Sequence, residues 1–282
     1  MHRSAVAFLA VLAAALVAVS LSAAAPDAAP QTHAYSRIVS LSPTVTEDLF
    51  AIGAGKQVIA VDQDSNYPKS APRTKLSGIN PNVEAVANYH PDLVVVSYGG
   101  KYVHQLKQLG IKVVDEPAVA AISGEYQEIE KLGAITGHSA RAAALVRSMQ
   151  TKLQAIVRSV PASRRHLRVY HELDPTYYSA TSKTFIGSVY ALFGFSNIAD
   201  KADKEHTGYP QLSAEYILKA NPQIIVLADG QTPAQVEKRP GWGAIAAVQD
   251  HRVVAVDEDV ASRWGPRIVL FAEAVARIAR AS

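Results

Sequence analysis

Two stretches of the chain share one pattern of polar and apolar positions. In each, a polar turn and an acidic residue open a short helical segment, a proline breaks it, and four apolar residues follow. Glu84 and Glu215 are the acidic residues, and both precede the breaking proline by the same interval. The apolar runs 93–96 and 224–227 are typical of buried strands bounded by turn residues. The repeated order predicts two similar lobes of one design.

The other apolar runs extend this pattern through both halves of the chain. In the first half we expect strands at 37–41, 58–61, 93–97 and 111–114, with helices at 43–52, around Glu84 and at 102–109. In the second half we expect strands at 167–170, 224–227 and 252–256, with helices at 184–193, around Glu215 and at 266–279. Ser42-Pro43 is a typical helix start, and Thr44 with Glu47 fits a capping box. The alternation predicts an α/β fold with mostly parallel sheets.

A long helix is predicted between the two halves. Residues 139–160 contain no proline or glycine, and apolar residues recur at helical spacing. At about 1.5 Å per residue this helix is about 30 Å long, enough to bridge two lobes as a rigid strut. The expected organisation is a signal peptide (1–24), a leader (25–35), an N-terminal lobe (36–122), linker helices (123–162) and a C-terminal lobe (163–282). The apolar stripe consists of Leu145, Met149, Leu153, Ile156 and Val160.

The first residues have the pattern of an export signal. Arg3 supplies the positive start, residues 5–21 are almost wholly apolar, and small residues follow at 22–25. A retained membrane anchor, as in a tethered sensor, is the alternative. The sequence contains no cysteine, which excludes disulfides and a lipid-modified cysteine. We therefore expect a periplasmic or secreted protein, free in its compartment after signal cleavage.

Composition and motifs disfavour several functional classes. The formal net charge is +3 with scattered basic residues, which argues against a nucleic-acid surface. The chain has no nucleophile-elbow motif and no phosphate-loop lysine motif, so we expect no enzyme and no catalytic residues. The histidines lack metal-ligand spacing, which predicts no dedicated metal site. The alternative is an exported enzyme of chelatase-like fold that acts through His171, Glu172 and His206.

Several short motifs, in their order and spacing, resemble one family. They are Arg37 to Pro43 with Thr46-Glu47, Asn66-Tyr67-Pro68, Val83-Glu84 with Pro91 to Val94, Gly208 to Ser213 with Glu215, and Arg263 to Arg267. From about residue 36 onward the chain resembles the periplasmic substrate-binding proteins of the iron-complex and vitamin B12 class, which serve ABC importers. The resemblance implies two lobes with a ligand cleft between them, and a monomer that docks on an ABC permease dimer. It implies that Glu84 and Glu215 are the acidic residues that pair with permease arginines.

Aromatic residues gather where strands are expected to end, which is where open α/β sheets bind ligands. The expected ligand-binding residues are Tyr67, Tyr98, Tyr177, Tyr178, Tyr209, Arg263 and Trp264. Broad rings suit a large planar or macrocyclic ligand. The resemblance implies cobalamin, with a ferric siderophore or haem as the alternative, so that any metal belongs to the ligand and no cofactor is expected. For Arg263 a salt bridge with Asp257 or Asp259 is the other interpretation.

Overall fold

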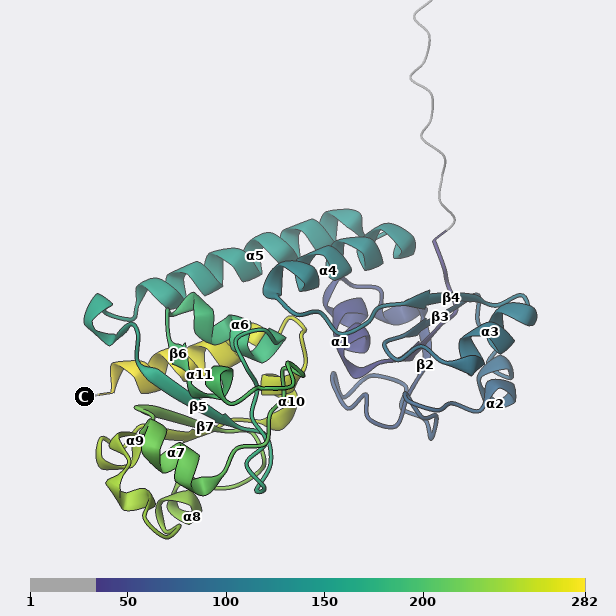
Figure 1. Ribbon diagram of the computed structural model, residues 1–282. Coiled ribbons are helices and arrows are strands. Elements are labelled where there is room, and N and C mark those ends of the chain that lie inside the picture. The colour runs from purple at the N-terminus through teal and green to yellow at the C-terminus, as the bar shows by residue number, and fades with distance from the viewer. Residues whose placement is uncertain (1–33, 282) are drawn as a thin grey trace, which may run out of the picture. The chain divides into compact units, whose positions relative to one another are not determined.

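The computed structural model describes residues 34–281 (Figure 1). The expected signal peptide and nearly all of the expected leader lie outside the described residues. Within residues 34–281 no helix combines the length and the hydropathy that crossing a membrane requires.

The N-terminal lobe is built on a four-stranded parallel sheet. Its strands are β1 (Ile38–Leu41), β2 (Val58–Val61), β3 (Leu93–Val96) and β4 (Lys112–Asp115), in the order β2-β1-β3-β4. Its helices are α1 (Pro43–Ala51), α2 (Val83–Ala87) and α3 (Lys101–Gln108), with a 3-10 turn at Gly55–Gln57. Ser42 begins α1, because its hydroxyl accepts from the Val45 amide. The expected helix start is confirmed, but the side chain of Glu47 contacts arginines rather than forming a capping box.

The C-terminal lobe repeats this sheet. Its strands are β5 (Arg168–Glu172), β6 (Ser196–Asn197), β7 (Ile224–Leu227) and β8 (Val253–Ala255), in the order β6-β5-β7-β8 and all parallel. Its helices are α6 (Phe185–Leu192), α7 (Ala214–Ala220), α8 (Pro233–Glu237), α9 (Ala246–Gln249), α10 (Glu258–Ser262) and α11 (Ile268–Arg280). Short 3-10 turns lie at Ala162–Arg164, Ile198–Lys201 and Trp242–Ala244. The prediction of two parallel α/β sheets is confirmed, although the two-residue β6 was not foreseen.

The duplication extends to single hydrogen bonds. Arg37 donates to the carbonyls of Tyr89 and His90, which follow α2. Arg168, 131 positions later in the sequence, donates to the carbonyls of Ala220 and Asn221, at the end of α7. His90 and Asn221, also 131 positions apart, both adopt a left-handed conformation, with φ of 49° and 47°. The same chain path therefore occurs twice, down to its helix ends.

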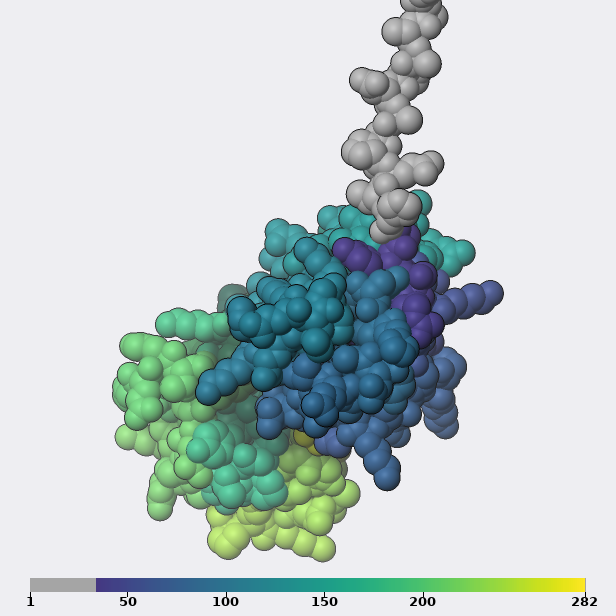
Figure 2. Space-filling model, turned by 90° about the vertical axis from the view of Figure 1, so that its right-hand side faces the viewer, coloured from purple at the N-terminus to yellow at the C-terminus, as the bar shows by residue number. Residues whose placement is uncertain are grey.

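Two antiparallel helices, α4 (Ile122–Thr136) and α5 (Ser139–Arg158), connect the lobes. Gly137 makes the turn between them with φ of 77°, a conformation that favours glycine. The predicted long helix is confirmed, and its buried face includes Met149 and Leu153. The main hydrophobic core contains residues of β1, β3, β5 and β7 together with α4, α5 and α11, whereas each lobe has a smaller core on the other face of its sheet. In the space-filling view the N-terminal lobe is purple to blue and the C-terminal lobe is green to yellow (Figure 2).

Candidate functional site

Besides Tyr67, three exposed tyrosines lie on loops at the carboxyl ends of strands or beside such a loop. Tyr98 follows β3 and is 52% exposed, and Tyr178, on the segment after β5, is 40% exposed. Tyr209 is 47% exposed and lies in the segment that runs beside that of Tyr178. A backbone bridge joins Tyr178 to Gln211, and the Ser179 amide donates to the Pro210 carbonyl. The fold therefore presents tyrosines of both lobes to solvent at strand ends, where open sheets bind ligands.

Tyr209 lies at the edge of a cavity. Burial raises the pKa of the Tyr209 phenol, and the nearby Tyr98 hydroxyl raises it further. This cavity, of about 420 Å³, belongs to the C-terminal lobe. The residues that line it are Tyr178, Ala202, Asp203, Lys204, Glu205, Thr207, Tyr209, Pro210 and Gln211. Its volume lies within the range of small-molecule sites.

Tyr177 has a different environment from Tyr178. Its half-buried ring stacks on Trp242, with ring centroids 6.0 Å apart and planes inclined by 28°. Tyr177 has a left-handed backbone conformation, with φ of 73°, and the cavity lining includes Tyr178 but not Tyr177. Tyr177 therefore belongs to the layer behind the cavity wall.

A second group of predicted residues forms a junction between the lobes. The carboxylate of Glu47, on α1, accepts from Arg263 at 2.9 Å and from two nitrogens of Arg267 at 2.7 and 2.6 Å. Arg263 also contacts Asp259 at 2.7 Å, and its side chain is only 10% exposed. A guanidinium whose N–H groups are used in this way has few hydrogen-bond donors left for a ligand. The structure thus gives Arg263 the salt-bridge role that was the alternative for this residue.

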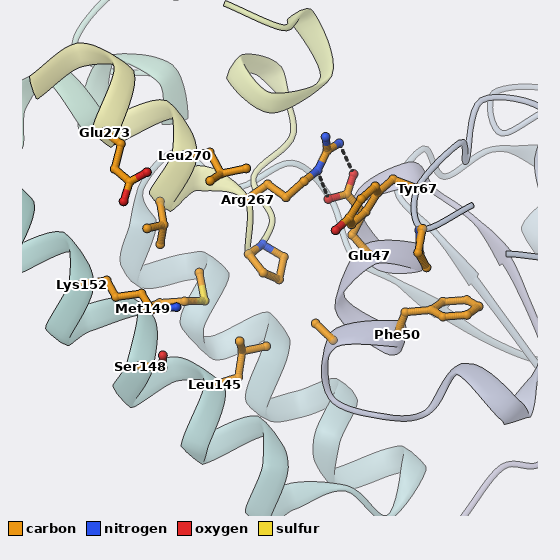
Figure 3. A pocket seen from close by; sticks show the side chains of 14 residues that line it. Glu47, Phe50, Tyr67, Leu145, Ser148, Met149, Lys152, Arg267, Leu270 and Glu273 are labelled. Atoms are coloured by element: carbon orange, nitrogen blue, oxygen red, sulfur yellow. Dashed lines mark hydrogen bonds and ion pairs between the residues drawn. The ribbon is translucent and has the colours of Figure 1, made fainter. Parts of the chain in front are cut away.

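The junction borders a cavity of about 630 Å³ (Figure 3). Tyr67 lies over Arg267, with the guanidinium carbon 4.5 Å from the ring centroid. The other walls come from α1, α5 and α11, including Phe50, Leu145, Met149 and Leu270. Tyr67 is therefore placed with Arg267 and Glu47, in a cavity whose lining does not include Tyr98, Tyr178 or Tyr209.

Buried carboxyl groups surround the base of this junction. They are Asp48 of α1, Glu116 after β4, and Glu125 and Glu128 of α4. Burial raises the pKa of Asp48 and of Glu125 well above the usual range, and the neighbouring carboxyl groups add to both shifts. The indole of the predicted ligand residue Trp264 donates to Glu128 at 3.2 Å, so this ring packs inside the junction.

Glu128 makes the stability of the protein depend on pH. Burial, followed by the charge of Glu116, raises the pKa of Glu128 to about 8. The folded state therefore keeps a proton that the unfolded state releases above its ordinary pKa of 4.5. This contribution is fully present below pH 4.5 and is lost as the pH rises towards 8. As the pH rises between 4.5 and 8, the proton that Glu128 retains lowers the free energy of unfolding by up to about 1.4 kcal/mol per pH unit.

We expect Glu128→Gln to flatten this dependence, because the amide stays neutral at every pH and still accepts from Trp264. Urea unfolding at pH 5, 6.5 and 8 measures the slope for wild type and variant. Glu130→Gln, exposed on the same helix, is the matched control and should keep the wild-type slope. An unchanged slope in Glu128→Gln would show that Glu128 is already ionised at neutral pH.

Glu84 and Glu215 occupy equivalent exposed positions on the two lobes. Each lies in the first turn of its helix, α2 or α7, and no salt bridge within residues 34–281 involves either of them. The caps also correspond: Asn82 accepts from the Ala85 amide at 2.8 Å, and Ser213 from the Tyr216 amide at 3.1 Å. A carboxylate near a helix N-terminus is stabilised by the helix dipole. Both are therefore available as charged groups for a partner.

Two residues of the alternative enzyme hypothesis, His171 and Glu172, are committed to internal contacts, whereas the third, His206, is exposed. His171 is fully buried beside Tyr190, at 2.6 Å, and burial lowers its pKa to about 3. Glu172 is buried and accepts from Arg239 and Tyr170. Across residues 34–281, no group of three or more histidine or acidic side chains is arranged to hold a metal ion.

The sequence did not predict the ion pairs of Glu47 with Arg263 and Arg267, or that of Arg239 with Glu172. The partners of Glu47 lie more than 200 positions away, so no local pattern connects them. The spacing of Glu47 from Thr44 even suggested a helix cap. One indication of these ion pairs is present in the sequence. Glu47 is a carboxylate on the side of α1 that faces the core, and a buried carboxylate needs a hydrogen-bonding or charged partner.

Comparison with known proteins identifies the family to which this fold belongs. The family described as periplasmic binding protein matches residues 38–260. The ABC transporter substrate-binding lipoprotein YvrC of Bacillus subtilis, itself uncharacterised, is 35% identical over 83% of this chain and 76% of its own. A cobalamin-binding protein of Halobacterium salinarum is 34% identical over 87% of this chain and 69% of its own.

Solved structures agree with these relatives. The periplasmic vitamin B12 binding protein BtuF of Vibrio cholerae superposes with a TM-score of 0.74 at 25% identity, covering 87% of this chain and 97% of its own. A possible iron-binding periplasmic solute-binding protein of Staphylococcus epidermidis gives 0.75 at 28% identity, covering 87% and 99%. The names of these proteins all describe the binding of a solute, in YvrC for an ABC transporter, and the present protein is a solute-binding protein of the same family. The chain belongs to the periplasmic binding protein family.

Proposed function

We propose that this protein captures cobalamin between its two lobes and delivers it to the permease of an ABC importer. The observation that carries the proposal is a cavity of about 420 Å³ lined by the exposed rings of Tyr178 and Tyr209, together with the exposed ring of Tyr98 on the other lobe. The named cobalamin binders among its relatives support this choice of ligand.

The chemistry of the exposed tyrosines suits a large, mostly flat solute. A tyrosine ring buries a large area at a small cost in conformational entropy, and its hydroxyl can bond to amide groups at the ligand edge. We assign ligand contact to Tyr98, Tyr178 and Tyr209. Tyr177 supports them from behind, whereas Tyr67, Arg263 and Trp264 serve the junction. Affinity then comes from aromatic burial rather than from an arginine.

Haem or a ferric siderophore is the second candidate ligand. The relative from Staphylococcus epidermidis is described as possibly binding iron. A single tyrosine phenolate suffices as an axial ligand of haem iron. Tyr98 and Tyr209 offer exposed phenols for that role.

Delivery is assigned to Glu84 and Glu215, one on each lobe. Two carboxylates on separate lobes can report the spacing of the lobes to a symmetric partner, through charge-assisted bonds to arginines of a permease dimer. Their equivalent positions on α2 and α7 support this assignment. We propose that the protein works as a monomer in the periplasm or outside the cell after signal cleavage. The sequence has no cysteine for the lipid attachment that the name of its Bacillus relative implies.

Calorimetric and absorbance titrations test the ligand. Purified protein is mixed separately with cyanocobalamin, haemin and a ferric hydroxamate siderophore. We expect one equivalent of cyanocobalamin to bind at micromolar concentration or below, with weaker binding of the other two. Tighter binding of haemin or of the siderophore would transfer the assignment to that ligand, and binding of none would refute this solute class.

A further inference from the structure

Arg239 holds a buried carboxylate at the end of the central C-terminal strand. It donates to both oxygens of Glu172, at 2.7 and 2.6 Å, and to Gln231 at 2.9 Å. Its side chain is 14% exposed, and that of Glu172 is fully buried. Such a bidentate pair fixes the orientation of the guanidinium plane.

The guanidinium also packs on two aromatic rings. Its central carbon lies 4.5 Å from the ring centroid of Trp242 and 5.2 Å from that of Tyr177. Cation–π contacts of this kind are strongest where water is excluded. Arg239 therefore connects the end of β5 to the ring of Tyr177.

Tyr177 in turn fixes the backbone that carries the exposed tyrosines. The Leu212 amide donates to the Tyr177 carbonyl at 3.0 Å, and the Leu173 amide donates to the Tyr178 carbonyl at 2.9 Å. The first bond attaches the segment of Tyr178 to the segment of Tyr209, and the second closes the turn that carries Tyr177 and Tyr178. A displaced Tyr177 would shift both exposed rings.

The duplicated lobe shows that the sheet itself does not need this ion pair. The position equivalent to Glu172, 131 residues earlier, is Leu41, which ends β1 and is fully buried. The N-terminal lobe thus builds the same strand end with an apolar residue. Replacing a buried ion pair with apolar residues is often neutral for stability, so a retained pair calls for another explanation.

We propose that Arg239, through Glu172 and Tyr177, is a positioning residue that sets the Tyr178 and Tyr209 wall of the cavity for the solute. The proposal depends on the proposed function, because the wall matters only if a solute binds there. Arg239 need not touch the solute.

The test uses Arg239→Met with Glu172→Leu, an apolar pair that copies the leucine found at position 41 of the other lobe. Binding of cyanocobalamin is measured by calorimetry, and amide hydrogen exchange is measured for 173–181 and 208–212. We expect the affinity to fall at least tenfold and exchange in the two segments to accelerate, while the unfolding midpoint in urea falls only as far as the lost acceptor of the buried Tyr170 hydroxyl requires. Arg239→Lys, with Glu172 unchanged, should keep part of the wild-type affinity and part of the wild-type protection from exchange. Lysine keeps the positive charge but loses the bidentate contact.

Two controls separate positioning from general damage. Arg252→Lys changes another buried, ion-paired arginine of the same lobe and should leave affinity and exchange unchanged. In a Tyr178→Ala, Tyr209→Ala background, the apolar pair should lower affinity no further. Wild-type affinity and exchange in the apolar pair would overturn the proposal. If wild type binds none of cyanocobalamin, haemin and the ferric siderophore, the proposed function fails, and unchanged exchange in 173–181 would still refute the positioning role independently.

Discussion

Replacing both Glu84 and Glu215 with alanine is expected to abolish solute uptake while leaving solute affinity unchanged. Each carboxylate is exposed at a helix start, so its removal disturbs no internal contact within the described residues. Losing one partner of a docked charge pair costs about 2–5 kcal/mol, so the loss of two predicts at least a 100-fold fall in uptake. Uptake into proteoliposomes that contain the permease measures the first effect, and calorimetry measures the second.

The single variants and a matched pair sharpen this test. Either single substitution should leave weak residual uptake, because one lobe can still dock. Glu130→Ala with Glu258→Ala removes two exposed carboxylates elsewhere and should leave uptake unchanged. If the Glu84 and Glu215 variant instead lost solute affinity, these residues would belong to the binding site. Full uptake by that variant would rule out their docking role.

Glu47→Ala is expected to cause the largest loss of stability, about 3–5 kcal/mol in the free energy of unfolding. The substitution leaves Arg263 and Arg267 buried without the carboxylate that both contact. Removing one member of a buried charge cluster costs more than removing the whole cluster. Urea unfolding, followed by circular dichroism at neutral pH, measures the difference.

Two comparisons identify the cause of that loss. Glu130→Ala, exposed on α4, should change the unfolding free energy by less than about 0.5 kcal/mol. Glu47→Leu combined with Arg263→Met and Arg267→Met should cost less than Glu47→Ala, because the only charge that then loses its partner is that of the partly exposed Asp259. A loss below about 1 kcal/mol in Glu47→Ala would show that the junction ion pairs contribute little to stability.

Local patterns were sufficient to predict the fold. Apolar runs such as 93–96 and 224–227 are buried strands because both faces of a parallel sheet are covered, and their flanking prolines mark the ends. The long helix α5 follows from helical spacing without breaking residues. The two-residue strand β6 has too little periodicity to be recognised.

The site was less predictable, because its contacts join distant parts of the chain. Tyr177 and Tyr178 are adjacent residues of the same type, and only the folded backbone determines which of the two rings stacks on Trp242. Arg263 was expected at a ligand, but its partners Glu47 and Asn66 come from the other lobe. No spacing in the sequence encodes such pairings, since they depend on how the two lobes pack.

In the proposed function, tyrosines of both lobes hold one solute, and a titration of tyrosine variants tests this directly. Cyanocobalamin is titrated by calorimetry into wild type, Tyr98→Ala, Tyr209→Ala and the double variant. We expect one equivalent to bind to wild type, about a tenfold loss of affinity for each single variant, and a larger loss for the double. Wild-type affinity in the double variant would contradict binding between the lobes.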